Sequence, residues 1–227
     1  DFVAMKQRAD ERDGTTPETV KAGKVATKWA ENLVDGIAAS KHTTLPRFLF
    51  ALGIMHIGES TARTLASWLG RLEFVRSMPA SVLRVLPDVG DEVAASIAGF
   101  FAQEGNQQVV DALLAAGIVF SDETAPSPLL RERLDLGVLL GQAGVSKLGP
   151  KSCRVLVEHF PTLDRLVAGG PAHWSTAGLP QAAAAGLAEH LADPSAMANL
   201  REAEAAMQRL LGAIPATAEV ARAPLDG

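Results

Sequence analysis

Three short segments of the sequence each contain a glycine at a position where a phosphate group could bind. In each segment a hydrophobic residue precedes the glycine and a small residue follows four positions after it, as in Ile57-Gly58 and Ala62. Glycine permits a positive φ and lets a ligand approach the backbone closely. It stands where a second helix begins, and the free N–H groups and dipole of a helix N-terminus favour an anion. The pattern therefore predicts two helices joined by a hairpin that would hold a nucleic-acid phosphate without reading bases.

The other two segments are centred on Gly90 and Gly149. Polar and basic side chains near the glycines, and two lysines further upstream, are expected to add contacts to phosphates. In decreasing order of expectation, the candidate DNA-binding residues are Gly58, His56, Ser60, Thr61, Arg63, Lys24, Lys28, Gly149, Lys151, Ser152 and Gly90. Gly90 comes last because Asp88, Asp91 and Glu92 surround it and would repel a phosphate.

The same residues allow other interpretations. A tight connection in a helical bundle would contain the same glycines, and this alternative stays open for any single segment. Residues 144–152 also resemble a nucleotide-binding P-loop, but Pro150 precedes Lys151 and the residues before the loop have a helical period. As a hairpin, the segment places Pro150 at the first helical position. Cys153 takes the place of Ala62 and is expected to pack in a core.

The sequence contains an internal repeat with a constant offset. The residues that match at an offset of 91 are Gly58 and Gly149, Ala62 and Cys153, Leu65 and Leu156, Leu69 and Phe160, and Leu72 and Leu163. A unit of roughly 75–80 residues therefore occurs twice. The second copy is degenerate, since residues 180–185 replace its second hairpin without a usable glycine. We expect that part of the second copy to pack without binding phosphate.

The net charge of −5 is distributed unevenly along the chain. Residues 20–76 carry a net charge of +4 and residues 147–165 carry +2, whereas residues 77–146 carry −6. Charge that alternates along a sequence can gather on one face of a fold, although ordinary solvated helix faces are the simpler interpretation. The overall acidity therefore does not exclude a nucleic-acid partner.

The composition favours an all-α protein. Apolar residues, mostly Ala and Leu, make up 48% of the chain, aromatic residues only 5%, and Tyr is absent. Strands of sandwiches and barrels usually need more aromatic and β-branched residues. The single cysteine excludes an internal disulfide and a cysteine-type zinc site, and the scattered histidines lack metal-ligand spacing. No apolar run is long enough for a membrane span, so we expect a cytoplasmic protein.

Helical periodicity predicts the elements that would position the hairpins. We expect helices over residues 25–40, 45–52, 59–69, 79–86, 91–102 and 106–116, then near 129–143 and over 150–159, 162–168, 180–192 and 194–212. The polar stretch 121–127 is the expected domain boundary. The chain would then consist of an N-terminal connector (1–19), a first domain (20–122), a second repeat (129–212) and a linker (213–227).

Residues 20–120 resemble the helix-hairpin-helix domain of bacterial NAD-dependent DNA ligases in order and spacing. The resemblance is carried by residues 31–41, 47–62 and 87–90, and residues 224–227 resemble the lead-in to the BRCT domain that ends those ligases. The sequence departs from the family at three places. Residues 24–26 lack the usual Gly-x-Gly, and Met55 stands where Arg is common. Residues 126–222 lie where a short connector is usual, so we interpret the second repeat as an insertion.

The resemblance implies a tandem helix-hairpin-helix (SAM-like) fold and a parent enzyme that uses NAD to adenylate itself. That enzyme seals 5′-phosphate/3′-hydroxyl nicks in duplex DNA during replication and repair. This segment would hold nicked duplex through phosphates on the minor-groove side and would contact other domains of the ligase. It would be non-catalytic and would need no cofactor, because NAD, magnesium and zinc belong to other parts of the parent.

Two other functions fit the same residues. The chain could be a helix-hairpin-helix module of another repair or recombination protein, or a helical adaptor whose hairpins are only turns and whose ligand is a protein. If DNA is the ligand, only a few phosphates would be neutralised, so we expect weak binding that depends steeply on salt.

Overall fold

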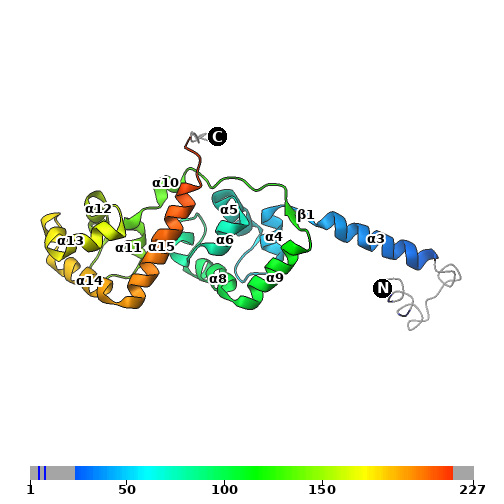
Figure 1. Ribbon diagram of the computed structural model, residues 1–227, viewed down its shortest axis with the longest axis horizontal. Coiled ribbons are helices and arrows are strands. Elements are labelled where there is room, and N and C mark those ends of the chain that lie inside the picture. Colours follow the sequence, from blue (N-terminus) through cyan, green and yellow to red (C-terminus); the bar gives the residue numbers. More distant parts are fainter. Residues whose placement is uncertain (1–4, 6–7, 9–23, 217–227) are drawn as a thin grey trace. The chain divides into compact units, whose positions relative to one another are not determined.

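The computed structural model describes residues 24–216, together with residues 5 and 8 (Figure 1). These residues form helices α3–α15 and one two-stranded sheet, which confirms the predicted all-α fold. None of these helices combines the length and the apolar character that crossing a membrane requires. Most of the predicted connector 1–19 and the final residues 217–227, which include the expected lead-in at 224–227, lie outside the described residues.

The chain divides into two compact units, which are described separately. The small unit consists of residues 1–44 and 110–121, and the large unit of residues 45–109 and 122–227. Helix α9 (Glu104–Ala115) contributes to both, since the large unit ends at Val109 and the small unit resumes at Val110. The domain boundaries expected from the sequence stay a prediction.

The small unit contains a long helix and a short parallel sheet. Helix α3 (Lys24–Ser40) leads into strand β1 (His42–Thr43), which pairs with strand β2 (Val119–Phe120). The N–H of Val119 donates to the C=O of Lys41 at 2.9 Å, and that of Ser121 donates to the C=O of Thr43 at 3.0 Å. Strands of two residues have no periodicity, so the sequence analysis did not predict them.

The first copy of the repeat occupies residues 45–109 of the large unit. Its helices are α4 (Leu45–Ala51), α5 (Glu59–Leu69), α6 (Leu72–Ser77), α7 (Ala80–Leu83), α8 (Asp91–Ala102) and the start of α9. Helices α4 and α5 pack against each other around Leu49, Leu65 and Leu69, whose side chains are fully buried. Gly70 ends α5 with a positive φ of 74°, a conformation that glycine adopts without strain at the end of a helix.

The second copy begins with α10 (Leu130–Arg133) and α11 (Leu136–Gln142). It continues with α12 (Pro150–His159), α13 (Leu163–Thr176), α14 (Gln181–Ala192) and α15 (Pro194–Gly212). The single helix predicted near 129–143 is wrong, because Asp135 starts a new helix there and its carboxylate accepts the N–H of Val138 at 2.8 Å. The helix predicted over residues 162–168 corresponds to the first part of α13, which is interrupted by the non-helical Gly170 (φ 67°, ψ 176°) before a second helical part ends at Thr176.

The polar stretch between the copies is packed against the first copy. The N–H of Thr124 donates to the C=O of Gly70 at 3.0 Å, and a Cβ on Gly70 would collide with the carbonyl oxygen of Thr124. Two carboxylates of the same stretch accept helix N–H groups, Asp122 from Leu45 and Glu123 from Leu72, both at 2.8 Å. Residues 122–127, which we call the strap, therefore complete the caps of α4 and α6.

Helix α15 connects the two copies within the large unit. It packs against α7 of the first copy and against α11, α13 and α14 of the second. Its residues Leu200, Ala203, Ala206 and Leu210 are buried. The guanidinium of Arg131 on α10 donates to the C=O of Ile214, just beyond the end of α15, at 3.0 Å. The two copies therefore share packing through α15.

Candidate nucleic-acid interface

Four hairpins in the large unit share one backbone arrangement. In each, a residue with positive φ is followed by a hydrophobic residue and then by the residue that caps the next helix. The residues in these three positions are His56, Ile57 and Gly58 in hairpin 1; Asp88, Val89 and Gly90 in hairpin 2; Lys147, Leu148 and Gly149 in hairpin 3; and Gly178, Leu179 and Pro180 in hairpin 4. Hairpins 1 and 2 belong to the first copy, and hairpins 3 and 4 to the second.

The first three hairpins are closed by the same turn. The N–H of the hydrophobic residue donates to the C=O three positions earlier, at 3.1 Å from Ile57, 3.3 Å from Val89 and 3.2 Å from Leu148. A turn of this kind with a positive φ at its third residue is of type II, which favours glycine there. Here His56 (φ 66°), Asp88 (φ 59°) and Lys147 (φ 61°) occupy that position. A left-handed L-residue costs about 1–2 kcal/mol, and such conformations cluster at functional sites.

The glycines that cap the helices have a different role from the one expected. Gly58, Gly90 and Gly149 have φ values of −90°, −80° and −89°, so the expectation that they supply a positive φ is wrong. The positive φ lies two residues earlier, on a residue that bears a side chain. A Cβ added at any of the three glycines would meet no atom within 4 Å. The glycines therefore leave open the space in front of each helix.

The helix that follows each glycine begins with N–H groups that have no partner within the helix. The capping C=O accepts the N–H four residues later, as from Ala62 to Gly58 at 3.0 Å and from Cys153 to Gly149 at 3.1 Å. The N–H groups of the preceding residues of the first turn are left for solvent or a ligand. In α12 Pro150 has no N–H, so Lys151 and Ser152 supply the available donors.

Hairpin 1 brings together the residues that the sequence analysis ranked highest. His56, Gly58 and Ser60 are exposed and Thr61 is half-buried. Arg63 is exposed as well, and its guanidinium forms an ion pair with Glu59 at 2.7 Å. An ion pair this exposed contributes little to stability, so a phosphate could compete for Arg63. Glu59 places a negative charge in the first turn of the same helix.

Hairpin 2 has the least favourable electrostatics for an anion. Asp88, Asp91 and Glu92 are all exposed around Gly90. The one basic side chain nearby in the described structure, Arg84, forms an ion pair with Asp91 at 3.0 Å. Of the candidate residues, Gly90 therefore keeps the last place.

Hairpin 3 carries the most positive charge of the four. Lys147, Lys151 and Arg154 are exposed, Ser152 is half-buried, and no acidic residue occurs between residues 144 and 157. Lys147 is not among the candidates predicted from the sequence, because nothing in a sequence shows that a lysine occupies the left-handed corner of a turn. The structure places it two residues before Gly149, beside the N-terminus of α12.

Hairpin 4 keeps the backbone form although it lacks a capping glycine. Residues 180–185 contain no glycine, but Gly178 just before them holds the left-handed position (φ 99°). Leu179 is buried, and its N–H donates to the C=O of Trp174 at 3.0 Å, five residues earlier instead of three. Pro180 caps α14. The absence of phosphate binding here stays a prediction.

The remaining two candidates belong to the small unit. Lys24 and Lys28 lie in α3, so residues 24–26 form the start of a helix rather than a hairpin. Lys28 is exposed. The structure therefore brings His56, Gly58, Ser60, Thr61 and Arg63 together in hairpin 1, and Gly149, Lys151 and Ser152 together in hairpin 3. It assigns the two lysines of α3 to a separate unit.

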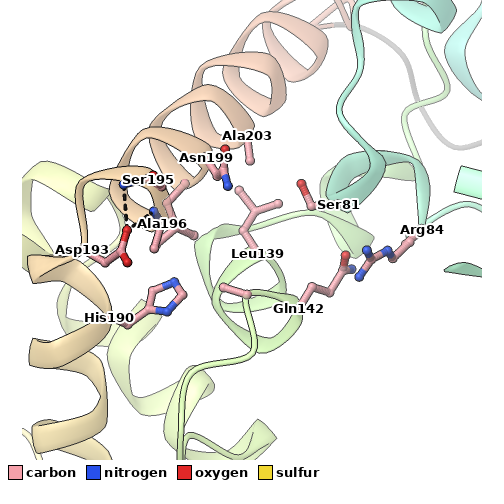
Figure 2. A pocket seen from close by; sticks show the side chains of 12 residues that line it. Ser81, Arg84, Leu139, Gln142, His190, Asp193, Ser195, Ala196, Asn199 and Ala203 are labelled. Carbon is pink, nitrogen blue, oxygen red and sulfur yellow. Dashed lines mark hydrogen bonds between the residues drawn. The ribbon is translucent and has the colours of Figure 1, made fainter. Parts of the chain in front are cut away.

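A pocket of about 390 Å³ lies where α7 of the first copy faces α11, α14 and α15 of the second (Figure 2). Arg84, Gln142, His190 and Asn199 are among the side chains that line it. Asp193 also lines it, but its carboxylate is already engaged, because it accepts the N–H groups of Ser195 and Ala196 at 2.7 and 2.9 Å. Arg84 and Asp193 carry opposite charges, and the lining comes from both copies, so the pocket marks the seam between them.

Other side chains that could carry chemistry are structural. Cys153 is buried, as expected, and burial raises the pKa of its thiol. Trp174 is buried, with its indole N–H donating to the C=O of Leu166 at 2.9 Å. The guanidinium of Arg133 covers the ring of Trp68 at 5.0 Å. Within the described part of the chain, no group of His, Cys, Asp and Glu side chains could hold a metal ion.

Comparison with known proteins agrees with this geometry. Residues 47–110 match the family model of the helix-hairpin-helix motif, which covers hairpins 1 and 2. The chain is 46% identical over 205 residues to the DNA ligase of Stenotrophomonas maltophilia (strain R551-3). It is 43% identical over 204 residues to that of Xanthomonas campestris pv. campestris (strain B100). The resemblance to bacterial DNA ligases found in the sequence is confirmed.

The alignments cover 90% of this chain but only 25% and 24% of those two proteins. The chain therefore spans about a quarter of the length of the relatives that it matches. An alignment of 204 or 205 residues extends beyond the first copy into the second, so these relatives also contain residues that align with part of the second copy.

Proposed function

We propose that this chain, which matches about a quarter of its DNA ligase relatives, is a non-catalytic part of a ligase that grips duplex DNA through backbone phosphates. The single observation that supports the proposal is the geometry shared by hairpins 1 and 3. Each presents unpaired helix N–H groups behind a glycine with open space in front of it. Each also exposes basic side chains beside that space, Arg63 in one and Lys147 with Lys151 in the other.

The proposed contacts ignore base sequence for a physical reason. Backbone N–H groups and a helix dipole recognise the negative charge of a phosphate, which is the same at every nucleotide. Two such sites in one rigidly packed unit would fix the position of the duplex relative to the protein. A ligase needs this property, because nicks occur at any sequence.

We extend the proposal to the parent protein on the basis of the family resemblance. The parent would be an NAD-dependent ligase that acts in the cytoplasm and seals nicks between a 5′-phosphate and a 3′-hydroxyl. NAD, magnesium and zinc would act in its other parts. The residues of the present chain would bind and orient the duplex while those parts perform the chemistry.

Glycine-to-alanine variants test the phosphate sites. Gly58→Ala and Gly149→Ala fit the observed backbone and meet no atom, so they should fold normally while placing a methyl group where the phosphate would lie. We expect each to weaken binding to a nicked duplex about tenfold, or about 1.4 kcal/mol, by fluorescence anisotropy. Lys151→Glu should weaken binding further by introducing a repulsive charge.

The matched control is Gly105→Ala, which adds a methyl group in open space on α9, away from the hairpins. Its affinity for DNA should equal that of the unmodified chain. Absence of binding at low salt, or equal affinities for Gly58→Ala, Gly149→Ala and Gly105→Ala, would contradict the proposal. Those results would favour the alternative of a helical protein adaptor.

A further inference from the structure

Hairpin 1 exposes an apolar side chain at its tip. Met55 is 71% exposed, which makes it the most exposed large hydrophobic residue among the described ones. It occupies the second position of the turn from Ile54 to Ile57, whose two end residues are buried at 4% and 7% exposure. The turn therefore anchors its ends in the core and directs its two middle residues, Met55 and His56, away from it.

The turn itself does not require a large apolar residue at this position. The equivalent residue is Pro87 in hairpin 2 and Ser146 in hairpin 3, and both turns close with the same hydrogen bond. Phe50, in the last turn of α4, is also 48% exposed, and its C=O accepts the N–H of Gly53 at 3.1 Å where the hairpin begins. Hairpin 1 therefore combines exposed apolar side chains with the proposed phosphate site.

The charged residues on the elements that flank Met55 indicate what covers it. Arg47 on α4, His56 in the turn and Arg63 on α5 are all exposed, and Arg63 pairs with exposed Glu59 at 2.7 Å. The first-turn N–H groups of α5 follow within a few residues. A surface that pairs basic groups and unpaired N–H donors with one projecting apolar side chain matches the backbone of a nucleic acid, where phosphates alternate with sugars and base edges. A two-residue corner is thin enough for a groove about 6 Å wide, whereas the major groove of about 12 Å fits a helix.

We propose that Met55 enters the minor groove beside the phosphate held by hairpin 1 and makes an apolar contact there with sugars and base edges. This inference rests on the proposed function. Methionine is unbranched and polarisable, so it adapts to irregular surfaces and would accept any base step. Apolar side chains, including methionine, are used as minor-groove wedges by other DNA-binding proteins. The contact would add affinity that does not depend on counterion release.

The first test separates an apolar contact from a charged one by its salt dependence. Met55→Ala should weaken binding to nicked duplex about threefold to tenfold. The factor should be similar at about 50 and 200 mM salt, because no charge is removed. Met55→Arg should instead increase the slope of log affinity against log salt by about one. Val109→Ala, at another exposed hydrophobic residue (56%) on α9, is the control and should bind as the unmodified chain does.

The second test locates the side chain in a groove. The chain has one cysteine, Cys153, which is buried, so Met55→Cys adds an accessible thiol next to the duplex. We expect a disulfide cross-link to a thiol tethered to guanine N2 in the minor groove, and much less to one tethered to cytosine C5 in the major groove. The unmodified chain should cross-link to neither.

The outcomes distinguish this inference from the function on which it rests. If the unmodified chain binds duplex but Met55→Ala binds equally well, or if the major-groove tether cross-links as readily, the contact by Met55 is refuted and the phosphate grip stands. If the unmodified chain does not bind duplex at low salt, both proposals fail.

Discussion

The backbone N–H of Leu163, the first residue of α13, donates to the carboxylate of Glu204 on α15 at 2.7 Å. The equivalent N–H in the first copy, that of Leu72, donates to Glu123 at 2.8 Å. The two copies therefore satisfy the same helix N-terminus with a glutamate from a different part of the chain. In the second copy the glutamate is buried, at 8% exposure, and in the first it is exposed.

We predict that Glu204→Gln destabilises the large unit more than Glu123→Gln does. Replacing a buried charged acceptor by a neutral one weakens the hydrogen bond from the N–H of Leu163. We therefore expect a loss of about 1–3 kcal/mol in the free energy of unfolding. Glu123 is exposed, so water can replace part of its contact with Leu72. Urea unfolding followed by circular dichroism measures both. Equal losses would show that burial of Glu204 does not matter.

Lys147→Gly should raise stability and lower affinity for DNA. Glycine adopts the positive φ of this corner without strain, but it loses more chain entropy on folding than lysine does. The net gain in the free energy of unfolding is therefore up to about 1 kcal/mol. The variant also removes a charge of hairpin 3, so the salt slope of binding should fall by about one. Lys147→Gln is the control, because it removes the charge but keeps a side chain in the strained conformation. It should lose the same slope without the gain in unfolding free energy.

Glu59→Gln should tighten binding to DNA. Glu59 pairs with Arg63 and lies in the first turn of α5, so its removal frees a cation and eliminates a repulsive charge beside the proposed phosphate. We expect about a threefold gain at low salt and a loss of stability of at most about 1 kcal/mol. Glu158→Gln is the control, because it removes an exposed negative charge near the C-terminal end of α12, at the opposite end from Gly149. It should leave affinity nearly unchanged. A gain as large in Glu158→Gln would mean that net charge alone sets the affinity.

The cap of α15 should make stability depend on pH in acid. The N–H groups of Ala196 and Ser195 donate to Asp193 and hold the pKa of its carboxyl below its usual range. A lowered pKa in the folded state means that the stabilisation is present above the unfolded value of about 3.9 and is lost as pH falls through the folded value. Asp193→Asn should therefore flatten the decline of the urea midpoint below about pH 4. Glu189→Gln on α14 is the control and should retain that decline.

Helices whose ends are marked by a local residue could be predicted from the sequence. Gly58 and Gly70 mark the ends of α5, Gly149 with Pro150 marks the start of α12, and Asp193 with Pro194 marks that of α15. The offset of 91 residues also located hairpin 3 from hairpin 1. Local signals sufficed because capping and turn formation involve residues close in sequence.

Features that depend on tertiary contacts or on strained backbone could not be predicted. The capping role of the strap is one such feature, because Asp122 and Glu123 accept N–H groups of helices that begin more than 50 residues earlier in the chain. The left-handed conformations of His56, Asp88 and Lys147 were assigned to the wrong residues, since sequence statistics favour glycine there. Neither feature follows from the local preferences of the residues concerned.

The strap has a consequence for how the first copy forms during synthesis. The helix-hairpin-helix match ends at residue 110, but the N-termini of α4 and α6 are completed only by Asp122 and Glu123. A nascent chain that has emerged to residue 110 would thus contain every helix of the motif and still lack two of its caps. Its cooperative folding should wait until residues 122–127 have left the ribosome, so the segment that folds as a unit is longer than the segment that matches the motif.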